Sequence, residues 1–161
     1  MICFSVWVDQ LAGMLNLSAP DLTQHPPRSP RSRLGGLVHL PRLLDKARAF
    51  AAGKNGEYNF PCPLDEWLLK FLGIDPQALL AEVKKGSSDS VMLEWVEGQT
   101  KRMPYEVQAW STWMEQRSPG GADGHTSFAA SIKKDAPERD DIRTLFDRLD
   151  FDDYVSFGGK G

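Results

Sequence analysis

A run of basic residues in the first third of the chain has the chemistry of an anion-binding site. Between residues 28 and 54, seven basic residues accompany a single acidic one, so this segment carries a net charge of +6. Arginine presents a planar fork of N–H groups that suits phosphate or carboxylate. Glycine lets the backbone approach a ligand, and a helix N-terminus offers further N–H groups with partial positive charge. This order of residues predicts that an anionic ligand is held by Arg28, Arg31, Arg33, Gly35, Gly36, Arg42 and Lys46.

The same arginines have a second interpretation. The whole chain has a net charge of −3, and the part after residue 54 carries −7. Because ion pairs within one chain are common for arginine, we favour a basic segment that is tied to the acidic remainder. A net acidic chain with one short basic stretch also lacks the broad basic face of a nucleic-acid-binding protein, which argues against that partner.

Four polar residues share one face of a helix expected over residues 36–52, namely His39, Arg42, Asp45 and Lys46. A histidine near a carboxylate can act as a general base close to neutral pH. Ion pairs along a helix face are routine, however. We therefore favour a solvated polar face on which Asp45 bridges Arg42 and Arg48.

Cys62 stands between two prolines at the expected start of a helix, where the helix N-terminus favours a reactive thiolate. Asp65, three residues later, opposes this by favouring the protonated thiol. We favour a buried, unreactive cysteine, which is the common state of this residue. The enzyme alternative places His39, Asp45, Cys62 and Asp65 together in a polar site that acts on a small metabolite.

Metal and cofactor sites are not indicated. The histidines at positions 25, 39 and 125 have no zinc-site spacing. The acidic residues at 147, 150, 152 and 153 do not match a calcium-binding loop, although their pattern leaves open one Mg²⁺ bound through two carboxylates. The chain carries no Walker loop, nucleophile elbow or dinucleotide fingerprint. We expect no bound metal and no cofactor.

Cysteine usage and hydropathy indicate a cytoplasmic location. The chain has two cysteines, whereas a secreted domain that relies on disulfides usually has four or more. The apolar run at residues 2–8 is too short to span a membrane and lacks the basic start of a signal peptide. We therefore expect a cytoplasmic protein with no membrane partner.

The spacing of apolar residues predicts an all-α fold, a compact bundle of six or seven short helices with an extended arginine-rich N-terminal arm. The strongest pattern runs from Gly36 to Ala52, with apolar residues at intervals of three and four. Pro41 marks either the true start of that helix or a kink. Further helices are expected at 63–72, from Pro76 to Gly86, after a cap at Ser88 or Asp89, from Pro104 to Ser118, and at 126–134 and 140–150.

A length of 161 residues suits one domain. We expect a peripheral N-terminal extension at 1–19, a single helical domain at 20–157 and a flexible tail at 158–161. A second methionine, Met14, precedes an ordinary polar start, so residues 1–13 fit an extension from an upstream start codon.

Six sequence blocks carry a resemblance to a known family. They are residues 27–31 (PRSPR), 34–48 (LGGLVHLPRLLDKAR), 57–58 (EY), 62–65 (CPLD), 71–75 (FLGID) and 152–160 (DDYVSFGGK). In this order, over about residues 16–160, they resemble a family of small bacterial proteins known only as a domain of unknown function. Family members often have serine where this chain has Met103, which implies a weaker N-cap for the helix from Pro104. The resemblance implies no particular activity and no catalytic residues.

The sequence thus favours a non-catalytic binding or interaction module that engages an anionic ligand or an acidic protein partner through its basic segment. The alternative is the enzyme with a site around His39, Asp45, Cys62 and Asp65. A third hypothesis is an assembly role through exposed tryptophans. Whether the protein is an enzyme, and its oligomeric state, stay open at this point.

Overall fold

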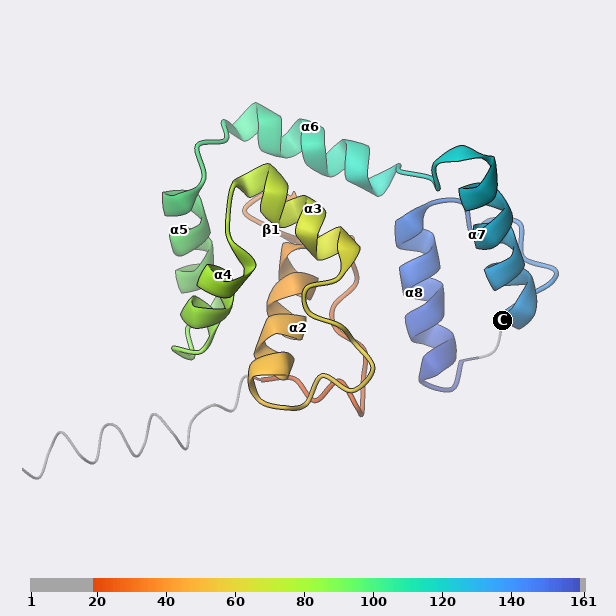
Figure 1. Cartoon of the computed structure of the whole chain (residues 1–161), viewed down its shortest axis with the longest axis horizontal. Coiled ribbons are helices and arrows are strands. Elements are labelled where there is room, and N and C mark those ends of the chain that lie inside the picture. Colours follow the sequence, from red (N-terminus) through yellow and green to blue (C-terminus); the bar gives the residue numbers. More distant parts are fainter. Residues whose placement is uncertain (1–18, 160–161) are drawn as a thin grey trace, which may run out of the picture. The chain divides into compact units, whose positions relative to one another are not determined.

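The computed structural model describes residues 19–159 and contains seven helices and one two-stranded hairpin in that range (Figure 1). The strands are β1 (Arg33–Leu34) and β2 (Leu37–Val38), and the helices are α2 (Leu40–Ala51), α3 (Pro63–Leu72), α4 (Pro76–Val83), α5 (Asp89–Gln99), α6 (Pro104–Glu115), α7 (Gly121–Asp135) and α8 (Leu145–Ser156). The prediction of a mostly helical fold with six or seven short helices is confirmed. None of these helices is both long and apolar enough to cross a bilayer. The extension predicted at 1–19 lies almost wholly outside the described residues.

The described residues form two compact units. One unit comprises residues 19–23 and Leu43–Lys101, and the other comprises Gln24–Arg42 and residues 102–159. The boundary falls inside α2, between Arg42 and Leu43. The single domain expected over residues 20–157 stays a prediction.

Local chemistry sets the helix ends of the first unit. Helix α3 begins at Pro63 and ends at Gly73, whose φ of 73° is left-handed, a conformation that glycine adopts without strain. The carboxylate of Asp75 caps α4 by accepting the N–H groups two and three residues later, at 2.9 and 3.1 Å. Ser88 caps α5 in the same way. The helix boundaries predicted at these positions are confirmed.

The second unit contains a β-hairpin where the sequence predicted a helix. Strands β1 and β2 pair antiparallel, and Gly35 and Gly36 form the turn with φ of 58° and 80°. Two successive positive φ angles match the right-handed twist of paired strands, which is why glycines occupy such turns. The helix predicted from Gly36 begins at Leu40 instead, with Pro41 in its first turn. The alternative in which the helix truly starts near Pro41 is therefore confirmed, whereas the helical prediction for residues 36–39 is wrong.

Helix α6 packs against β2. The Ser111 hydroxyl accepts the Val38 N–H at 3.3 Å and donates to the Gly36 carbonyl at 2.9 Å, so one side chain satisfies two backbone groups of the hairpin. At the start of α6, Met103 offers no side-chain cap, as expected. The Glu106 carboxylate accepts the Met103 N–H at 2.8 Å instead, and this hydrogen bond lowers the pKa of Glu106.

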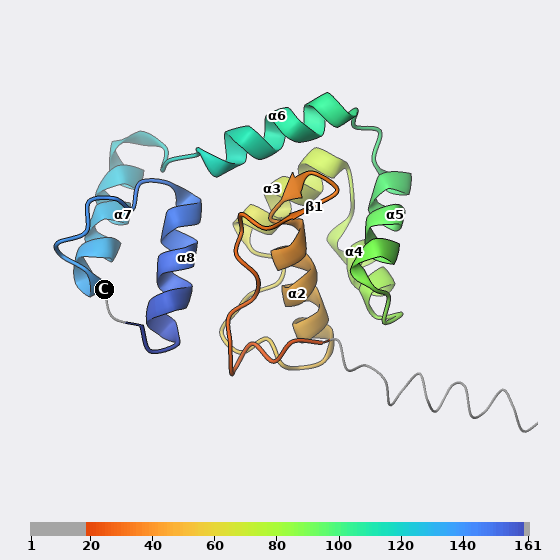
Figure 2. The same cartoon turned by 180° about the vertical axis from the view of Figure 1, so that it is seen from behind.

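Helices α7 and α8 run side by side in the second unit, joined by residues 136–144 (Figures 1 and 2). Their shared apolar cluster consists of Ile132, Ala136, Ile142 and Phe151. The two helices predicted at 126–134 and 140–150 exist, but their predicted bounds are wrong. Helix α7 begins at Gly121. Helix α8 begins at Leu145 because the Thr144 hydroxyl accepts the Asp147 N–H at 3.0 Å and ends the preceding loop.

Candidate functional site

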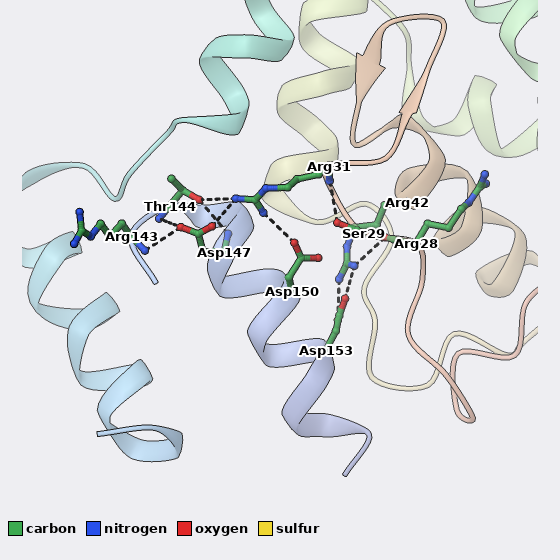
Figure 3. Close-up of polar contacts among 9 residues, drawn as sticks. All are labelled: Arg28, Ser29, Arg31, Arg42, Arg143, Thr144, Asp147, Asp150 and Asp153. Carbon is green, nitrogen blue, oxygen red and sulfur yellow. Dashed lines mark hydrogen bonds and ion pairs between the residues drawn. The ribbon is translucent and has the colours of Figure 1, made fainter. Parts of the chain in front are cut away.

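Three aspartates on α8 face the arginines of the basic segment within the second unit (Figure 3). Asp147, Asp150 and Asp153 recur every three residues, which places them along one side of the helix. Arg31 bridges the first two, with Nη2 at 2.5 Å from Asp147 Oδ1 and Nη1 at 2.9 Å from Asp150 Oδ2. The Arg31 side chain retains 38% exposure. The guanidinium also lies over the Phe146 ring, 5.9 Å from its centroid.

Asp147 links this network to the start of α8. Partial burial opposes ionisation of its carboxyl group. The N–H groups of Thr144 and Arg143, the Thr144 hydroxyl and the charge of Arg31 outweigh that cost and hold the pKa of Asp147 below its usual value. The carboxylate of Asp147 therefore both caps α8 and pairs with the Arg31 guanidinium. It stays ionised throughout the physiological pH range.

Arg42 and Asp153 form a buried bidentate ion pair. Nη1 lies 2.6 Å from Oδ2 and Nη2 lies 3.1 Å from Oδ1, while the two side chains are only 3% and 9% exposed. Arg42 also donates to the Arg28 carbonyl at 3.2 Å, and the Arg28 guanidinium donates to the Pro41 carbonyl at 3.2 Å. These bonds tie the extended arm to α2 and α8.

Arg33 completes the set by donating to the Gly36 carbonyl at 3.0 Å and to the Glu115 carboxylate at 2.9 Å. The interpretation in which the arginines pair with acidic residues of the same chain is thus confirmed for Arg31, Arg33 and Arg42. Gly35 and Gly36 serve the hairpin turn. Of the seven predicted ligand-binding residues, Arg31 lines a pocket of the second unit.

That pocket has a volume of about 390 Å³ and mixed charge. Its lining residues are Arg31, Arg139, Asp141, Ile142, Asp147, Asp150, Phe151 and Tyr154. Arg139 donates two hydrogen bonds to Asp141, at 2.6 and 2.7 Å. These bonds lower the pKa of Asp141 to about 2 and raise the pKa of Arg139. The Arg139 guanidinium lies 5.7 Å from the centroid of the Phe151 ring.

Sequence reasoning missed Arg139, Asp141 and Tyr154. The first two stand two positions apart in the loop between α7 and α8, and Tyr154 lies near the end of α8. An arginine with an aspartate two residues away has no distinctive spacing. Only the fold brings these residues to the pocket that Arg31 lines.

The polar face of α2 is buried, so the prediction of a solvated face is wrong. His39, Arg42, Asp45 and Lys46 are all at most 8% exposed. Asp45 lies 4.0 Å from Arg48, which confirms one half of the predicted bridge, but Arg42 binds Asp153. His39 belongs to the second unit. Cys62 belongs to the first unit. The pairing of His39 with Cys62 in the enzyme alternative therefore stays a prediction.

In the first unit, Lys46 binds three acceptors. Its Nζ lies 2.6 Å from Asp65 Oδ2, 3.0 Å from Cys62 Sγ and 3.3 Å from the Asn59 carbonyl oxygen. The Asp65 carboxylate also accepts the Cys62 N–H at 2.8 Å. Cys62 is half-buried, so the prediction of a buried cysteine is wrong. Lys46, Cys62 and Asp65 form one polar cluster at the start of α3.

One known family matches the part of the sequence that contains these residues. The family described as "Domain of unknown function (DUF5069)" matches residues 24–155, which is most of the chain. The chain belongs to the DUF5069 family. The DUF5069 match extends from the arm into the last turn of α8 and so includes the arginine–aspartate network, the 390 Å³ pocket and the cluster around Lys46. None of the curated proteins matches this chain.

Proposed function

We propose that this DUF5069 protein is a non-catalytic binding module that holds a small anion, a carboxylate or a phosphate, in the pocket lined by Arg31 and Arg139. The observation that carries the proposal is that two half-exposed guanidinium groups line one pocket. A volume of about 390 Å³ suits a small metabolite.

Both guanidinium groups are held in place and retain hydrogen-bonding capacity. Within the described residues, the hydrogen bonds of Arg31 use three of its five N–H groups and those of Arg139 use two. Each group also lies over an aromatic ring. Fixed arginines lose little further entropy when a ligand binds, which favours recognition of a planar carboxylate or a phosphate.

The neighbouring carboxylates set a limit on affinity. Asp141, Asp147 and Asp150 also line the pocket, and the lowered pKa values of Asp141 and Asp147 keep them ionised near neutral pH. An incoming anion must therefore compete with these carboxylates for the arginines. We expect modest affinity that weakens with rising salt, because screening acts most strongly on exposed charges.

Calorimetric titration with inorganic phosphate and with succinate tests the proposal. Replacing Arg139 with alanine should weaken binding by roughly tenfold to a hundredfold, because a hydrogen bond to a charged group contributes about 1.5–3 kcal/mol. Arg31→Lys should weaken it as well, since lysine keeps the charge but loses the planar fork. The matched control is Arg102→Ala. Arg102 is an exposed, ion-paired arginine outside the pocket, 41% exposed against 42% for Arg139.

Equal affinity in the Arg139→Ala and Arg102→Ala variants would contradict the proposed site. Absence of binding to the wild-type protein by either probe would contradict the proposed ligand class. In the other form of this proposal, Arg31 and Arg139 bind an acidic segment of a protein partner. The same variants would then reduce capture of an aspartate-rich peptide.

The enzyme hypothesis retains one supporting observation, the contact between Cys62 and Lys46. A neighbouring lysine and a helix N-terminus are the surroundings in which cysteines become nucleophilic. If Cys62 is a nucleophile, iodoacetamide should modify its peptide faster than the same peptide in the unfolded protein. Lys46→Met, measured under conditions in which this destabilised variant is still folded, should remove the difference. A rate no faster than in the unfolded chain would count against an enzyme that uses Cys62.

A further inference from the structure

The outward side of α6 is an exposed, uncharged surface, which we call the α6 outer face. Its residues recur at intervals of three and four and are all exposed: Tyr105, Gln108, Ala109, Thr112, Trp113 and Gln116. They line an open groove of about 860 Å³ together with Arg117 and Ser118. The opposite side of the helix carries Ser111 and Met114, which are buried.

The composition of the α6 outer face is that of a protein interface. A quarter of the residues in the chain are charged, yet the six residues of this face are neutral. Two of its side chains are large aromatics that remain 70% (Tyr105) and 51% (Trp113) exposed. The centres of protein interfaces are depleted in charge and enriched in tyrosine, tryptophan and arginine. Arg117 adds a guanidinium 5.2 Å from the centroid of the Trp113 ring.

The arrangement of these residues is symmetric about Ala109. Tyr105 lies four residues before Ala109 and Trp113 lies four residues after it, so a large aromatic stands about one turn to each side of the smallest residue. A two-fold axis through Ala109 therefore brings Tyr105 of one copy opposite Trp113 of the other. Small residues at a crossing point also let two helices approach closely.

We propose that the α6 outer face is the interface between two copies of this protein. The two α6 helices run antiparallel and cross at Ala109, on a two-fold axis. Tyr105 of each copy then packs against Trp113 of the other, and the same residues occur on both sides, as in isologous dimers. This proposal concerns an assembly and is independent of the anion-binding pocket.

The small area of the α6 outer face limits the expected affinity of the dimer. Helix α6 has 12 residues and is about 18 Å long. One helix pair of this length buries less than about 1,200 Å², the range of weak and transient interfaces. The dimer should therefore be weak and should form only at micromolar concentrations or above.

Sedimentation velocity of the full chain, from about 1 to about 200 μM, tests the proposal. The wild-type protein should shift from monomer to dimer over this range. Ala109→Glu brings two like charges together on the axis and should weaken association at least about a hundredfold, while glutamate keeps the helix intact. Val91→Glu makes a similar change at another exposed apolar residue and should leave the dimer unchanged.

A crosslinking experiment locates the axis. Under mild oxidation, Ala109→Cys should form a disulfide between two copies, because the crossing brings the two Cα atoms within the roughly 4.4–6.8 Å that a disulfide spans. Wild type and Val91→Cys, which contain the same native cysteines, should not crosslink at a comparable rate. A monomer throughout the concentration range, or a dimer that survives Ala109→Glu, would overturn the proposal.

Discussion

An Asp153→Ala variant should lose about 3–5 kcal/mol of its free energy of unfolding, because the substitution leaves the Arg42 guanidinium buried without its carboxylate. Arg42 and Asp153 are only 3% and 9% exposed, and two hydrogen bonds join them. Because water does not reach the buried Arg42 guanidinium, hydration cannot replace the lost carboxylate. Urea unfolding followed by circular dichroism measures the loss.

Asp150→Ala is the matched control for this prediction. Asp150 lies on the same helix and pairs with an arginine of the same arm, but both partners are 38% exposed. Exposed ion pairs contribute about 0–1 kcal/mol. The double variant Arg42→Met/Asp153→Leu should regain most of the stability lost in Asp153→Ala, because it removes both buried charges. Equal losses for Asp153→Ala and Asp150→Ala would show that burial does not control the strength of this pair.

In the first unit, a Lys46→Met variant should lose about 3–5 kcal/mol of its free energy of unfolding, because it removes the lysine charge from the buried Asp65 carboxylate. Asp65 is fully buried, and its Oδ2 lies 2.6 Å from Lys46 Nζ. Methionine has nearly the length of the lysine stem, so packing changes little. The loss of stability therefore comes from the buried Asp65 charge and not from a cavity. It can be measured by urea unfolding at neutral pH.

The double variant Lys46→Met/Asp65→Asn separates charge from hydrogen bonding. Asparagine is neutral, and its side-chain oxygen can still accept the Cys62 N–H that Asp65 accepts at 2.8 Å. Most of the lost stability should return. If the double variant is as unstable as Lys46→Met, the cost lies in the lost lysine contacts to Asn59 and Cys62 and not in the buried carboxylate.

Helix boundaries were predictable where one or two neighbouring residues decide them. Asp75 before Pro76, Ser88, and Gly73 after α3 all act through hydrogen bonds or backbone angles within a few residues. Pro41 likewise indicated either a helix start or a kink, and α2 begins at Leu40, but the apolar spacing failed at residues 36–39. There the apolar spacing fits a helix, but a two-glycine turn and pairing between β1 and β2 are more favourable.

The pairing of arginines with carboxylates was also predictable, since a segment of +6 precedes a remainder of −7. The identity of each partner was not. Arg31 binds an aspartate 119 positions away, and Arg42 binds one 111 positions away. Charge totals contain no information about which side chains meet, because that depends on how the helices pack.

Burial was the property that only the tertiary structure decided. From the sequence, the polar face of α2 is indistinguishable from a solvated one, yet its four residues are enclosed. Exposed tryptophans were one hypothesis from the sequence, but only the structure shows that Trp113 is half-exposed on α6. Local hydrogen bonds and backbone angles act within a few residues and can be read along the chain. Burial depends on the neighbours that distant segments supply, and so the fully enclosed ion pairs, the pocket and the exposed face of α6 emerge only when the chain has folded.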